Sequence, residues 1–369
     1  MFPSALQQLL HLRKQDNLFR SLKTNYPAID FSSNDYLGFS TQGLLHNEIK
    51  NLEPSVKIGS TGSRLISGNS VLFNEIEHSI ARFHNAESAL LYNSGYDANV
   101  GLLSCIAHKG DLILSDELIH ASLIDGIRLS HATNYKFKHN SIDELTVLLE
   151  RHCHTHKEIY IVVESVYSMD GDTAPLQELV KLCKRYHANL IVDEAHAIGV
   201  FGDNGKGLCH ELNITNDCFA RIYTYGKAMG CHGASVVGSP ELKDYLINFS
   251  RSFIYTTAMP EHSLLAIKAA YGLLEKNNVL NSLKENIDYF SSQFKNIPNS
   301  IKSNSAIHCK LVAGNEQVDA LESSCSKNNL FIKSIKSPTV KQSQERIRIC
   351  LHAFNTKQEM DLLLSLIDL

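Results

Sequence analysis

Short apolar and β-branched runs alternate with helical patterns along the chain from about residue 88. A helical pattern at Leu176–Tyr186, directly after Pro175, is typical of the segments between these runs. Strands that alternate with helices predict a doubly wound α/β fold with a mostly parallel sheet. The strands predicted in this region are Ala89–Tyr92, Leu112–Leu114, Asn134–Phe137, Ile159–Val163, Leu190–Val192 and Arg221–Thr224.

The pattern changes at both ends of the chain. The first 30 or so residues predict a polar amphipathic helix followed by a loop, which is more typical of an arm than of a domain. After residue 260 a long helical pattern leads into a smaller α+β module, with strands expected at Ala306–Leu311 and Arg346–Leu351. A chain of 369 residues suits a large domain plus a smaller one. The expected parts are the arm, the large domain and the small domain, at 1–45, 46–260 and 261–369.

Composition and charge exclude several classes of protein. The net charge of −4 argues against a nucleic-acid backbone as the main partner. The N-terminal segment lacks the charged-then-apolar order of a signal peptide, and no apolar run approaches the roughly 18 residues of a membrane span. Nine cysteines without a CxxC pair indicate reduced thiols. We therefore expect a soluble, cytoplasmic protein without a membrane partner.

Polar residues follow most of the predicted strands. In a doubly wound sheet, ligands bind beyond the carboxyl ends of the strands. Acidic, basic and hydroxyl groups are therefore expected to converge on one edge of this sheet. The strand ends concerned are Asn93–Gly95, Ser115–Asp116, Glu164–Ser165, Asp193–Glu194 and Tyr225–Lys227.

Lys227 and Asp193 are the strongest chemical candidates at this edge. Lys227 follows an apolar strand and lies among small residues, so we expect burial to lower its pKa and leave a neutral amine that forms a Schiff base. Asp193 could bind a metal, accept a proton or cap a helix. Beside a Schiff-base lysine, its carboxylate would hold a pyridine nitrogen in the protonated form. Ser94–Tyr96 predicts either a phosphate site at a helix start or an ordinary turn.

Several common motifs are missing. The sequence has no GxGxxG, GxSxG or HExxH motif, and the Gly-Lys pairs at Lys206 and Lys227 lack the Ser or Thr that a P-loop needs. The run His152–His156 reads HCHTH and could bind a metal. Its alternating spacing fits neither a helical face nor a known zinc pattern, so a solvated helix end is the favoured interpretation. We therefore expect no metal site.

Taken together, several long segments resemble the α-oxoamine synthases, a family of fold-type I pyridoxal-phosphate enzymes. The resemblance spans nearly the whole chain, and its motifs occur in the family's order. It implies a large domain with a mostly parallel seven-stranded sheet, a smaller α+β C-terminal domain, pyridoxal 5'-phosphate as cofactor and a homodimer with a shared active site. The matching segments are FSSNDYLG at 31–38, GSTGSRLISGN at 59–69, SDELIHAS at 115–122, ESVYSMDGDTAPL at 164–176, VDEAHAIGV at 192–200 and TYGKAMGCHGA at 224–234.

The resemblance also implies roles for individual residues. Lys227 would hold the cofactor covalently and transfer a proton, while Asp193 would pair with the pyridinium nitrogen. His120 would stack on the ring, although it could also be an ordinary helix-start residue, and His196 would contact the 3-oxygen of the ring. The other cofactor contacts would be Ser94, Gly95, Tyr96, Ser168 and Thr224, with Thr256 or Thr257 reaching the phosphate across a dimer interface.

The implied substrate contacts are Arg20, Asn34, His120, Thr339 and Arg348. Arg348 would bind a carboxylate, but it could instead be a surface strand residue. The chain departs from the family at Lys336, where an Arg usually precedes the Pro-Thr-Val segment, and the change loses a planar two-pronged grip on a carboxylate. Ala197 replaces a usual Gly, and we expect its methyl group to narrow the pocket.

The reaction implied is a decarboxylative condensation of a small amino acid with an acyl thioester. The GSRLISGN string is most similar to the branch that uses L-alanine and a pimeloyl thioester, carried by coenzyme A or an acyl carrier protein. Branches that use glycine or serine with another acyl-CoA remain open. A non-catalytic regulator with the same fold is a further alternative, but the predicted lysine, acid and stacking histidine are all present.

Overall fold

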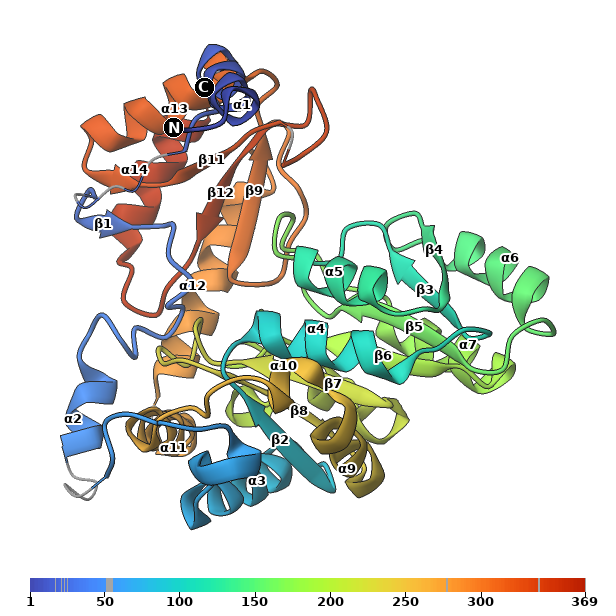
Figure 1. Ribbon diagram of the computed structural model, residues 1–369. Coiled ribbons are helices and arrows are strands. Elements are labelled where there is room, and N and C mark those ends of the chain that lie inside the picture. The colour runs from blue at the N-terminus through green and yellow to red at the C-terminus, as the bar shows by residue number, and fades with distance from the viewer. Residues whose placement is uncertain are drawn as a thin grey trace.

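The computed structural model describes residues 1–16, 18–20, 22, 24, 26–50, 56–276, 278–337 and 339–368. Its largest sheet has seven strands in the order β2-β8-β7-β6-β5-β3-β4 (Figure 1). All pairs from β7 across to β4 are parallel, whereas β8 runs antiparallel to both β7 and β2. The strands of this sheet are β2 (Ser88–Tyr92), β3 (Leu112–Asp116), β4 (Thr133–Phe137), β5 (Ile159–Glu164), β6 (Asn189–Asp193), β7 (Ala220–Thr224) and β8 (Ala234–Gly238). The predicted mostly parallel seven-stranded sheet is confirmed.

Helices cover both faces of this sheet because its central strands are apolar on both sides. In β3, Leu112 and Leu114 pack with α6 and α7, whereas Ile113 packs with α4 and α5 on the opposite face. This alternation follows the two-residue period of a strand. The helices of this part are α2 (Leu44–Lys50), α3 (Val71–Phe83), α4 (Gly95–Ile106), α5 (Ala121–Leu129), α6 (Ile142–His152), α7 (Leu176–Tyr186), α8 (Leu208–Glu211), α9 (Pro240–Phe249), α10 (Arg251–Ile254) and α11 (Glu261–Lys276).

The C-terminal part contains a three-stranded antiparallel sheet in the order β11-β12-β9. A separate parallel pair joins β1, from near the N-terminus, to β10. In Figure 1, α12 connects the region of the larger sheet to that of the smaller one. The elements are β1 (Ile29–Asp30), α12 (Val279–Phe294), β9 (Ile307–Leu311), α13 (Asn315–Lys327), β10 (Leu330–Phe331), β11 (Lys333–Ile335), β12 (Arg346–Cys350) and α14 (Lys357–Ile367).

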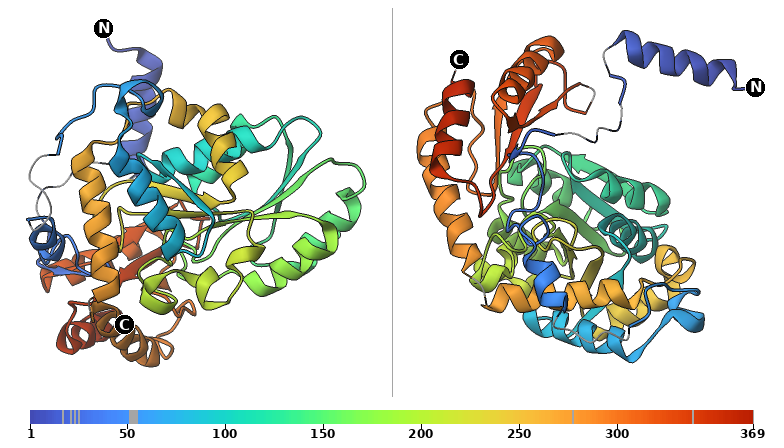
Figure 2. Two further views of the ribbon diagram at one scale, coloured as in Figure 1. Left: turned by 90° about the horizontal axis from the view of Figure 1, so that it is seen from below. Right: turned by 90° about the vertical axis from the view of Figure 1, so that its left-hand side faces the viewer.

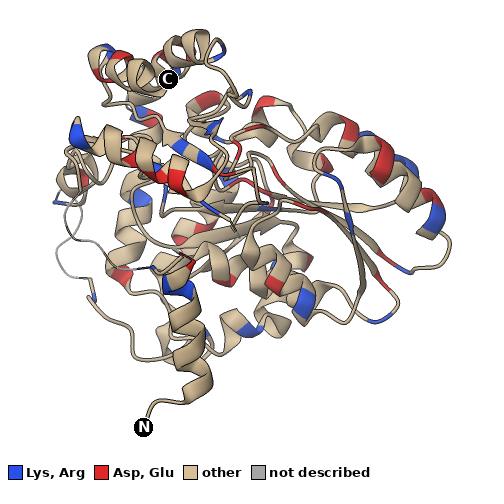
Figure 3. Cartoon of the chain, turned by 90° about the horizontal axis from the view of Figure 1, so that it is seen from above, with Lys and Arg blue, Asp and Glu red and all other residues tan. Residues whose placement is uncertain are grey.

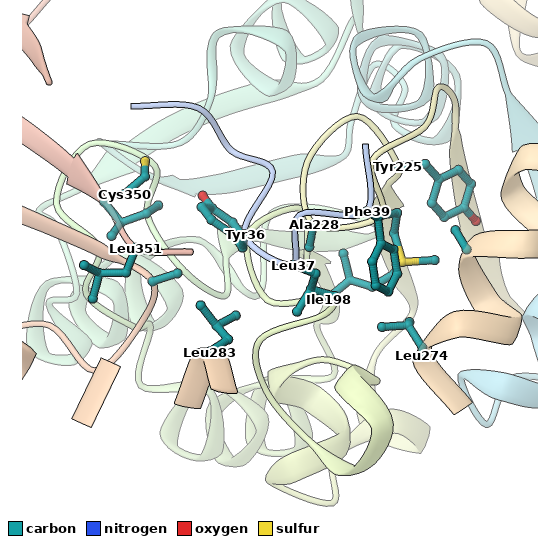
Figure 4. Packing of buried hydrophobic residues seen from close by; sticks show 14 of the residues in the cluster. Tyr36, Leu37, Phe39, Ile198, Tyr225, Ala228, Leu274, Leu283, Cys350 and Leu351 are labelled. Carbon is teal, nitrogen blue, oxygen red and sulfur yellow. The ribbon is translucent and has the colours of Figure 1, made fainter. Parts of the chain in front are cut away.

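A continuous hydrophobic cluster joins the two sheet regions. The segment Tyr36–Phe39 is fully buried at its aromatic residues and lies between the loops around Ile198 and Ala228 on one side and the Cys350–Leu351 strand end on the other (Figure 4). Replacing a buried phenylalanine such as Phe39 by alanine typically costs about 3–5 kcal/mol of stability. The segment therefore fixes the relative position of the parts that build the site.

The N-terminal helix α1 (Ser4–Gln15) has no buried residue and projects from the rest of the chain (Figure 2). The expected domain boundaries stay predictions. Helix α11, which begins directly after residue 260, packs against α2 and α3. Acidic and basic residues are interspersed along the outer helices (Figure 3). Among the described residues, no helix is both long and apolar enough to cross a lipid bilayer.

Candidate active site

A pocket of about 260 Å³ lies at the carboxyl ends of the strands of the larger sheet. It is lined by residues from the loops after β2, β3, β5, β6 and β7, as the strand-end rule predicts. The structure therefore brings together most of the cofactor residues expected from the sequence. These are Ser94, Gly95, Tyr96, His120, Asp193, His196, Thr224 and Lys227.

Lys227 lies in the tight loop that turns the chain from β7 back into β8. The loop is closed by hydrogen bonds from Gly230 N to Lys227 O (2.8 Å) and from Cys231 N to Tyr225 O (2.9 Å). Gly230 has a φ of +62°, and a Cβ there would lie 2.7 Å from Ser40 N, so only glycine fits. Lys227 lines the pocket, and its amine donates no hydrogen bond to any described residue.

The charge state of Lys227 follows from its surroundings. Burial is the largest influence and lowers the pKa of the amine, and Arg348 acts in the same direction. The carboxyl groups of Asp193 and Glu164 oppose this effect. The net pKa is below the ordinary lysine value, so the expected shift toward a neutral amine is confirmed.

Asp193 is buried at the end of β6 and is held by two donors. Its Oδ2 accepts a hydrogen bond from Asn99 Nδ2 (2.8 Å), and its Oδ1 accepts one from Ala195 N (2.9 Å). The residues after Asp193 form turns, and no described helix begins there, so the helix-cap interpretation is wrong. Fixed donors leave the carboxylate oriented toward the pocket, where it can face a cationic ring nitrogen.

Two histidines complete the walls of the pocket. His120 is the N-cap of α5 and interacts through Nδ1 with Ser122 Oγ (2.7 Å), so it is a helix-start residue and also lines the pocket. His196 Nδ1 lies 2.7 Å from the hydroxyl of Tyr36. Burial lowers the pKa of both histidines, and the nearby Lys227 adds to the effect. Both imidazoles are therefore neutral, which suits stacking and hydrogen bonding rather than ion pairing.

The start of α4 offers an anion site. Ser94 is its N-cap, and its Oγ accepts a hydrogen bond from Asp97 N (3.1 Å). A Cβ at Gly95 would lie 2.4 Å from Thr224 Cγ2, so glycine allows the helix start to approach β7 closely. Free backbone N–H groups and the helix dipole favour a phosphate at such a position. The helix start confirms the predicted geometry of Ser94 to Tyr96.

Three buried polar atoms around the pocket have no hydrogen-bond partner among the described residues. They are Asn99 Oδ1, Glu164 Oε1 and Thr224 Oγ1. A buried polar atom without a partner costs about 1–3 kcal/mol, so three of them around one pocket indicate that a polar group fills it. Pyridoxal phosphate fits this donor set, because its aldehyde, ring nitrogen and phosphate match the Lys227 amine, the Asp193 carboxylate and the start of α4.

Arg348 lies in β12 and is buried, so the alternative of a surface strand residue is wrong. Its Nε donates to the carbonyl of Ser168 (2.7 Å), and one terminal nitrogen donates to Asn34 Oδ1 (2.9 Å). Its positive charge acts to lower the pKa of both Lys227 and His196, so the guanidinium lies near the pocket. The structure thus gathers Asn34, Ser168 and Arg348 into one cluster beside the pocket lining.

The other predicted residues lie outside the lining. Thr256 Oγ1 and the Thr257 carbonyl both accept from the side chain of Asn93, at 3.2 and 2.9 Å. Arg20 and Thr339 are exposed. Their substrate and cofactor roles stay predictions.

The two departures from the family pattern lie apart from the pocket lining. Lys336 forms an ion pair with Asp319 Oδ2 at 2.8 Å. Ala197 is fully buried in the hydrophobic core that α6 and α7 cover. The expectation that its methyl group narrows the pocket is therefore wrong, because that methyl group packs into the core.

The His152–His156 run lies at the end of α6, where the imidazole of His152 stacks on Tyr135 with the ring centres 4.6 Å apart. This agrees with the interpretation as a helix end. Across the part of the chain that the structure describes, no group of three or more His, Cys, Asp or Glu side chains is arranged to hold a metal ion.

Sequence reasoning missed Asn99 and Tyr36 as contributors to the site. Asn99 lies one turn after Gly95 on α4, and that spacing is its only signal in the sequence. Tyr36 lies within a segment that resembles the family, at 31–38. Glu164, which follows a predicted strand, lines the pocket at the expected edge of the sheet.

Comparisons with known proteins agree with this geometry. Residues 26–367 match the aminotransferase class I and II family. An 8-amino-7-oxononanoate synthase from Emericella nidulans is 41% identical over 384 residues, covering 96% of this chain and 92% of that protein.

Two solved structures share the fold. The crystal structure of 8-amino-7-oxononanoate synthase from Francisella tularensis is 31% identical with a TM-score of 0.78, covering 92% of this chain and 96% of that one. A Sphingomonas wittichii serine palmitoyltransferase is 26% identical with a TM-score of 0.90, covering 100% and 97%. The chain therefore belongs to the class I and II aminotransferase family, among its pyridoxal-phosphate-dependent acyltransferases, the α-oxoamine synthases.

Proposed function

We propose that this chain condenses L-alanine with a pimeloyl thioester to give 8-amino-7-oxononanoate, carbon dioxide and a free thiol, a step of biotin biosynthesis. The observation that carries the proposal is the Lys227 amine of lowered pKa in one pocket with Asp193, His120 and His196. The choice of substrates is supported by the relative from Emericella nidulans, which aligns with 96% of the chain.

Lys227 and Asp193 would carry the proton chemistry. When bound, pyridoxal phosphate supplies a protonated ring that draws electron density from the amino acid. Lys227 would hold it covalently and, as a neutral amine, remove the proton from the alanine Cα. Asp193, oriented by Asn99 Nδ2 and Ala195 N, would stay anionic and keep the ring nitrogen protonated.

The remaining residues would orient the reactants. His120 would stack on the ring and His196 would contact its 3-oxygen, while Ser94, Gly95 and Tyr96 would hold the phosphate. Thr224, which lines the pocket, and Ser168, whose carbonyl accepts from Arg348 beside it, would make further cofactor contacts. Positioning of this kind lowers the activation barrier, because less translational and rotational entropy is lost in reaching the transition state.

Arg348 is proposed to bind the alanine carboxylate. Its guanidinium plane is fixed by Asn34 Oδ1 and the Ser168 carbonyl, which leaves the group preorganised for a planar anion. In the reaction a C–C bond forms between the alanine Cα and the thioester carbonyl, and the thiolate leaves. The alanine carboxylate then departs as carbon dioxide, and a proton returns to Cα. Arg20 and Thr339 are proposed as further substrate contacts.

A turnover assay tests the proposal. Purified protein with pyridoxal phosphate, L-alanine and pimeloyl-CoA or pimeloyl-acyl carrier protein should release thiol and 8-amino-7-oxononanoate in equal amounts, measured by thiol titration and mass spectrometry. The second candidate is condensation of serine or glycine with another acyl-CoA, favoured by the fold likeness to serine palmitoyltransferase. Thiol release with glycine or serine, and none with alanine, would replace the first candidate by the second.

We also propose that the chain is a cytoplasmic homodimer with a shared active site. Large apolar side chains are exposed on the segments around the proposed Thr256 and Thr257 contact, including Ile58, Ile66 and Tyr255. Large exposed apolar side chains close to one another are typical of a surface that a partner covers. Light scattering of the purified protein measures the mass, and a monomer at working concentration would contradict this part of the proposal.

A further inference from the structure

Glu164 lies at the centre of the candidate site. It is the last residue of β5, and its register partner across the parallel pair is Asp193. The side chain lines the pocket that also holds the Lys227 amine, and the residue is only 3% exposed. Two carboxyl groups and one amine therefore share a single enclosed space at adjacent strand ends.

Glu164 differs from its buried neighbour Glu194 because one of its two carboxyl oxygens has no hydrogen-bond partner among the described residues. The two oxygens of Glu194 accept hydrogen bonds from Leu208 N (2.8 Å) and Cys209 N (2.9 Å). Among the described residues, Glu164 has no ion-pair partner, and its Oε1 accepts no hydrogen bond. A buried carboxylate without a cation is strongly disfavoured, whereas the neutral acid is tolerated in the same place.

The neighbouring groups act in the same direction. Burial is the largest influence, and together with the negative charge of Asp193 it raises the pKa of Glu164 to about 8. Lys227 and the backbone N–H groups of Ser168 and His120 oppose the shift. Tyr167 is also close enough for Glu164 to influence its pKa. Burial raises the pKa of Tyr167 well above the ordinary tyrosine value, so Tyr167 stays neutral.

We propose that Glu164 is a positioning residue that carries its proton in the working enzyme and thereby keeps Lys227 in the neutral amine form. The direction of the effect follows from electrostatics, because an ionised Glu164 would raise the pKa of Lys227 and favour its ammonium form. An ammonium group can neither attach to an aldehyde nor accept a proton. Deprotonation of Glu164 at alkaline pH would therefore inactivate the site. The functional part of this inference rests on the proposed role of Lys227.

The first test uses the cofactor-free protein. Infrared spectra at neutral pH should contain the C=O stretch of a protonated carboxylic acid, and that band should be lost in Glu164→Gln. The matched control is Glu178→Gln, an exposed position on α7, which should keep the band. A spectrum in which Glu164→Gln and the unaltered protein have the same carboxyl region at neutral pH would overturn the inference.

The second test follows Lys227 directly. Acetic anhydride labelling of the cofactor-free protein, read by peptide mapping, reports the amine fraction of Lys227 as the pH rises. The unaltered protein should show a break in this curve near pH 8, because Glu164 then ionises and holds back deprotonation of the amine. Glu164→Gln should lose the break, and Glu164→Asp should restore it. Superimposable curves for the unaltered protein and Glu164→Gln would contradict the proposal.

The third test is the pH profile of turnover. Because glutamine cannot ionise, Glu164→Gln should lose the inflection of kcat near pH 8, whatever its kcat at neutral pH. Circular dichroism checks that each variant is folded. If the substrates proposed above are wrong, turnover fails in every variant while the infrared band and the labelling curves are unchanged, so the two failures are distinguishable. An alkaline limb that is identical in Glu164→Gln would count against this role.

Discussion

Two clusters at the same edge of the larger sheet combine one basic group with two carboxyl groups, yet they behave in opposite ways. In the first, His139 Nδ1 lies 3.1 Å from Asp116 Oδ1, and its Nε2 lies 2.8 Å from Asp172 Oδ2. Burial acts to lower the pKa of His139, but the hydrogen bonds to Asp116 and Asp172 outweigh it and raise the pKa to about 10. The imidazole is therefore a fixed cation.

In the second cluster, the Lys227 amine lies with Asp193 and Glu164 but makes no hydrogen bond to a described residue, and burial lowers its pKa. The residue types are nearly the same as in the first cluster, so chemical identity does not separate them. Hydrogen bonding of the basic group does. We call the His139 cluster closed, because both ring nitrogens lie within hydrogen-bond distance of a carboxylate, and the Lys227 cluster open, because its amine bonds to no described residue. A buried basic group with a shifted pKa and no hydrogen-bond partner marks the reactive cluster.

The largest effect is expected from removing the amine of the open cluster. Lys227→Ala should lower kcat/KM by at least about 10⁴-fold, because both the covalent attachment and the proton transfer are lost. The variant should also lose the pH-dependent visible absorbance of the covalently bound cofactor. The control Lys206→Ala also removes a lysine that follows glycine but lies outside the pocket lining, and it should change kcat/KM little. Comparable losses in both variants would contradict the special role of Lys227.

Neutralising one acid in each cluster sharpens the contrast. Asp193→Asn should lower kcat by about 10²–10⁴-fold, because the ring nitrogen loses its anionic partner. In the cofactor-free variant the pKa of Lys227 should fall further below its ordinary value, since Asp193 acts to raise it. Labelling rates against pH measure this shift. Asp172→Asn, in the closed cluster, should leave the labelling curve of Lys227 unchanged.

Breaking the closed cluster should reduce stability and depend on pH. The pKa of His139 is raised in the folded protein, so its contribution is complete below the ordinary pKa of 6.5 and is lost as pH rises through about 10. His139→Gln should lower the free energy of unfolding by about 2 kcal/mol at neutral pH, with the difference shrinking above pH 10. Urea unfolding at both pH values measures it. His131→Gln, at an exposed position, serves as control. A difference that grows above pH 10 would refute stabilisation by the charged His139.

The smallest effect is expected from removing one of the unpartnered oxygens around the pocket. Thr224→Val removes a buried hydroxyl whose Oγ1 has no partner among the described residues. Cofactor affinity should weaken by about fivefold, while the free energy of unfolding of the cofactor-free protein should not fall. Fluorescence titration and urea unfolding measure the two quantities. In Thr146→Val the lost hydroxyl donates to the Ile142 carbonyl at 2.8 Å, so the pattern should reverse, with lower stability and unchanged affinity.

The fold could be predicted wherever apolar runs were long enough to show a period. The helix Leu176–Tyr186 and six strands of the larger sheet were found in this way. β8 was missed because it returns from β7 through the Lys227 loop without a helix, and it pairs antiparallel. β1 and β10 contain two residues each, which is too short for any periodic signal. Short strands like these are defined by their partners rather than by their own sequence.

The site could be predicted where a residue follows a strand, because topology alone brings strand ends together. That rule and the family resemblance identified Lys227, Asp193 and His120. Asn99 was missed because helix residues have no comparable rule, and its importance depends on how α4 approaches β6. Ala197 was misjudged because sequence does not say which face of a turn meets the core. The prediction for Ala197 needed a direction in space, whereas those that placed Lys227 and Asp193 in the pocket needed only a position after a strand.

The three unpartnered oxygens around the pocket also bear on how long the chain survives in a cell. Their uncompensated desolvation weakens the cofactor-free fold, and a bound cofactor relieves it while adding its own binding free energy. Newly made chains in a cell short of vitamin B6 would then spend more time unfolded and be degraded faster. The supply of the vitamin would thus set the abundance of the protein as well as the fraction that is active.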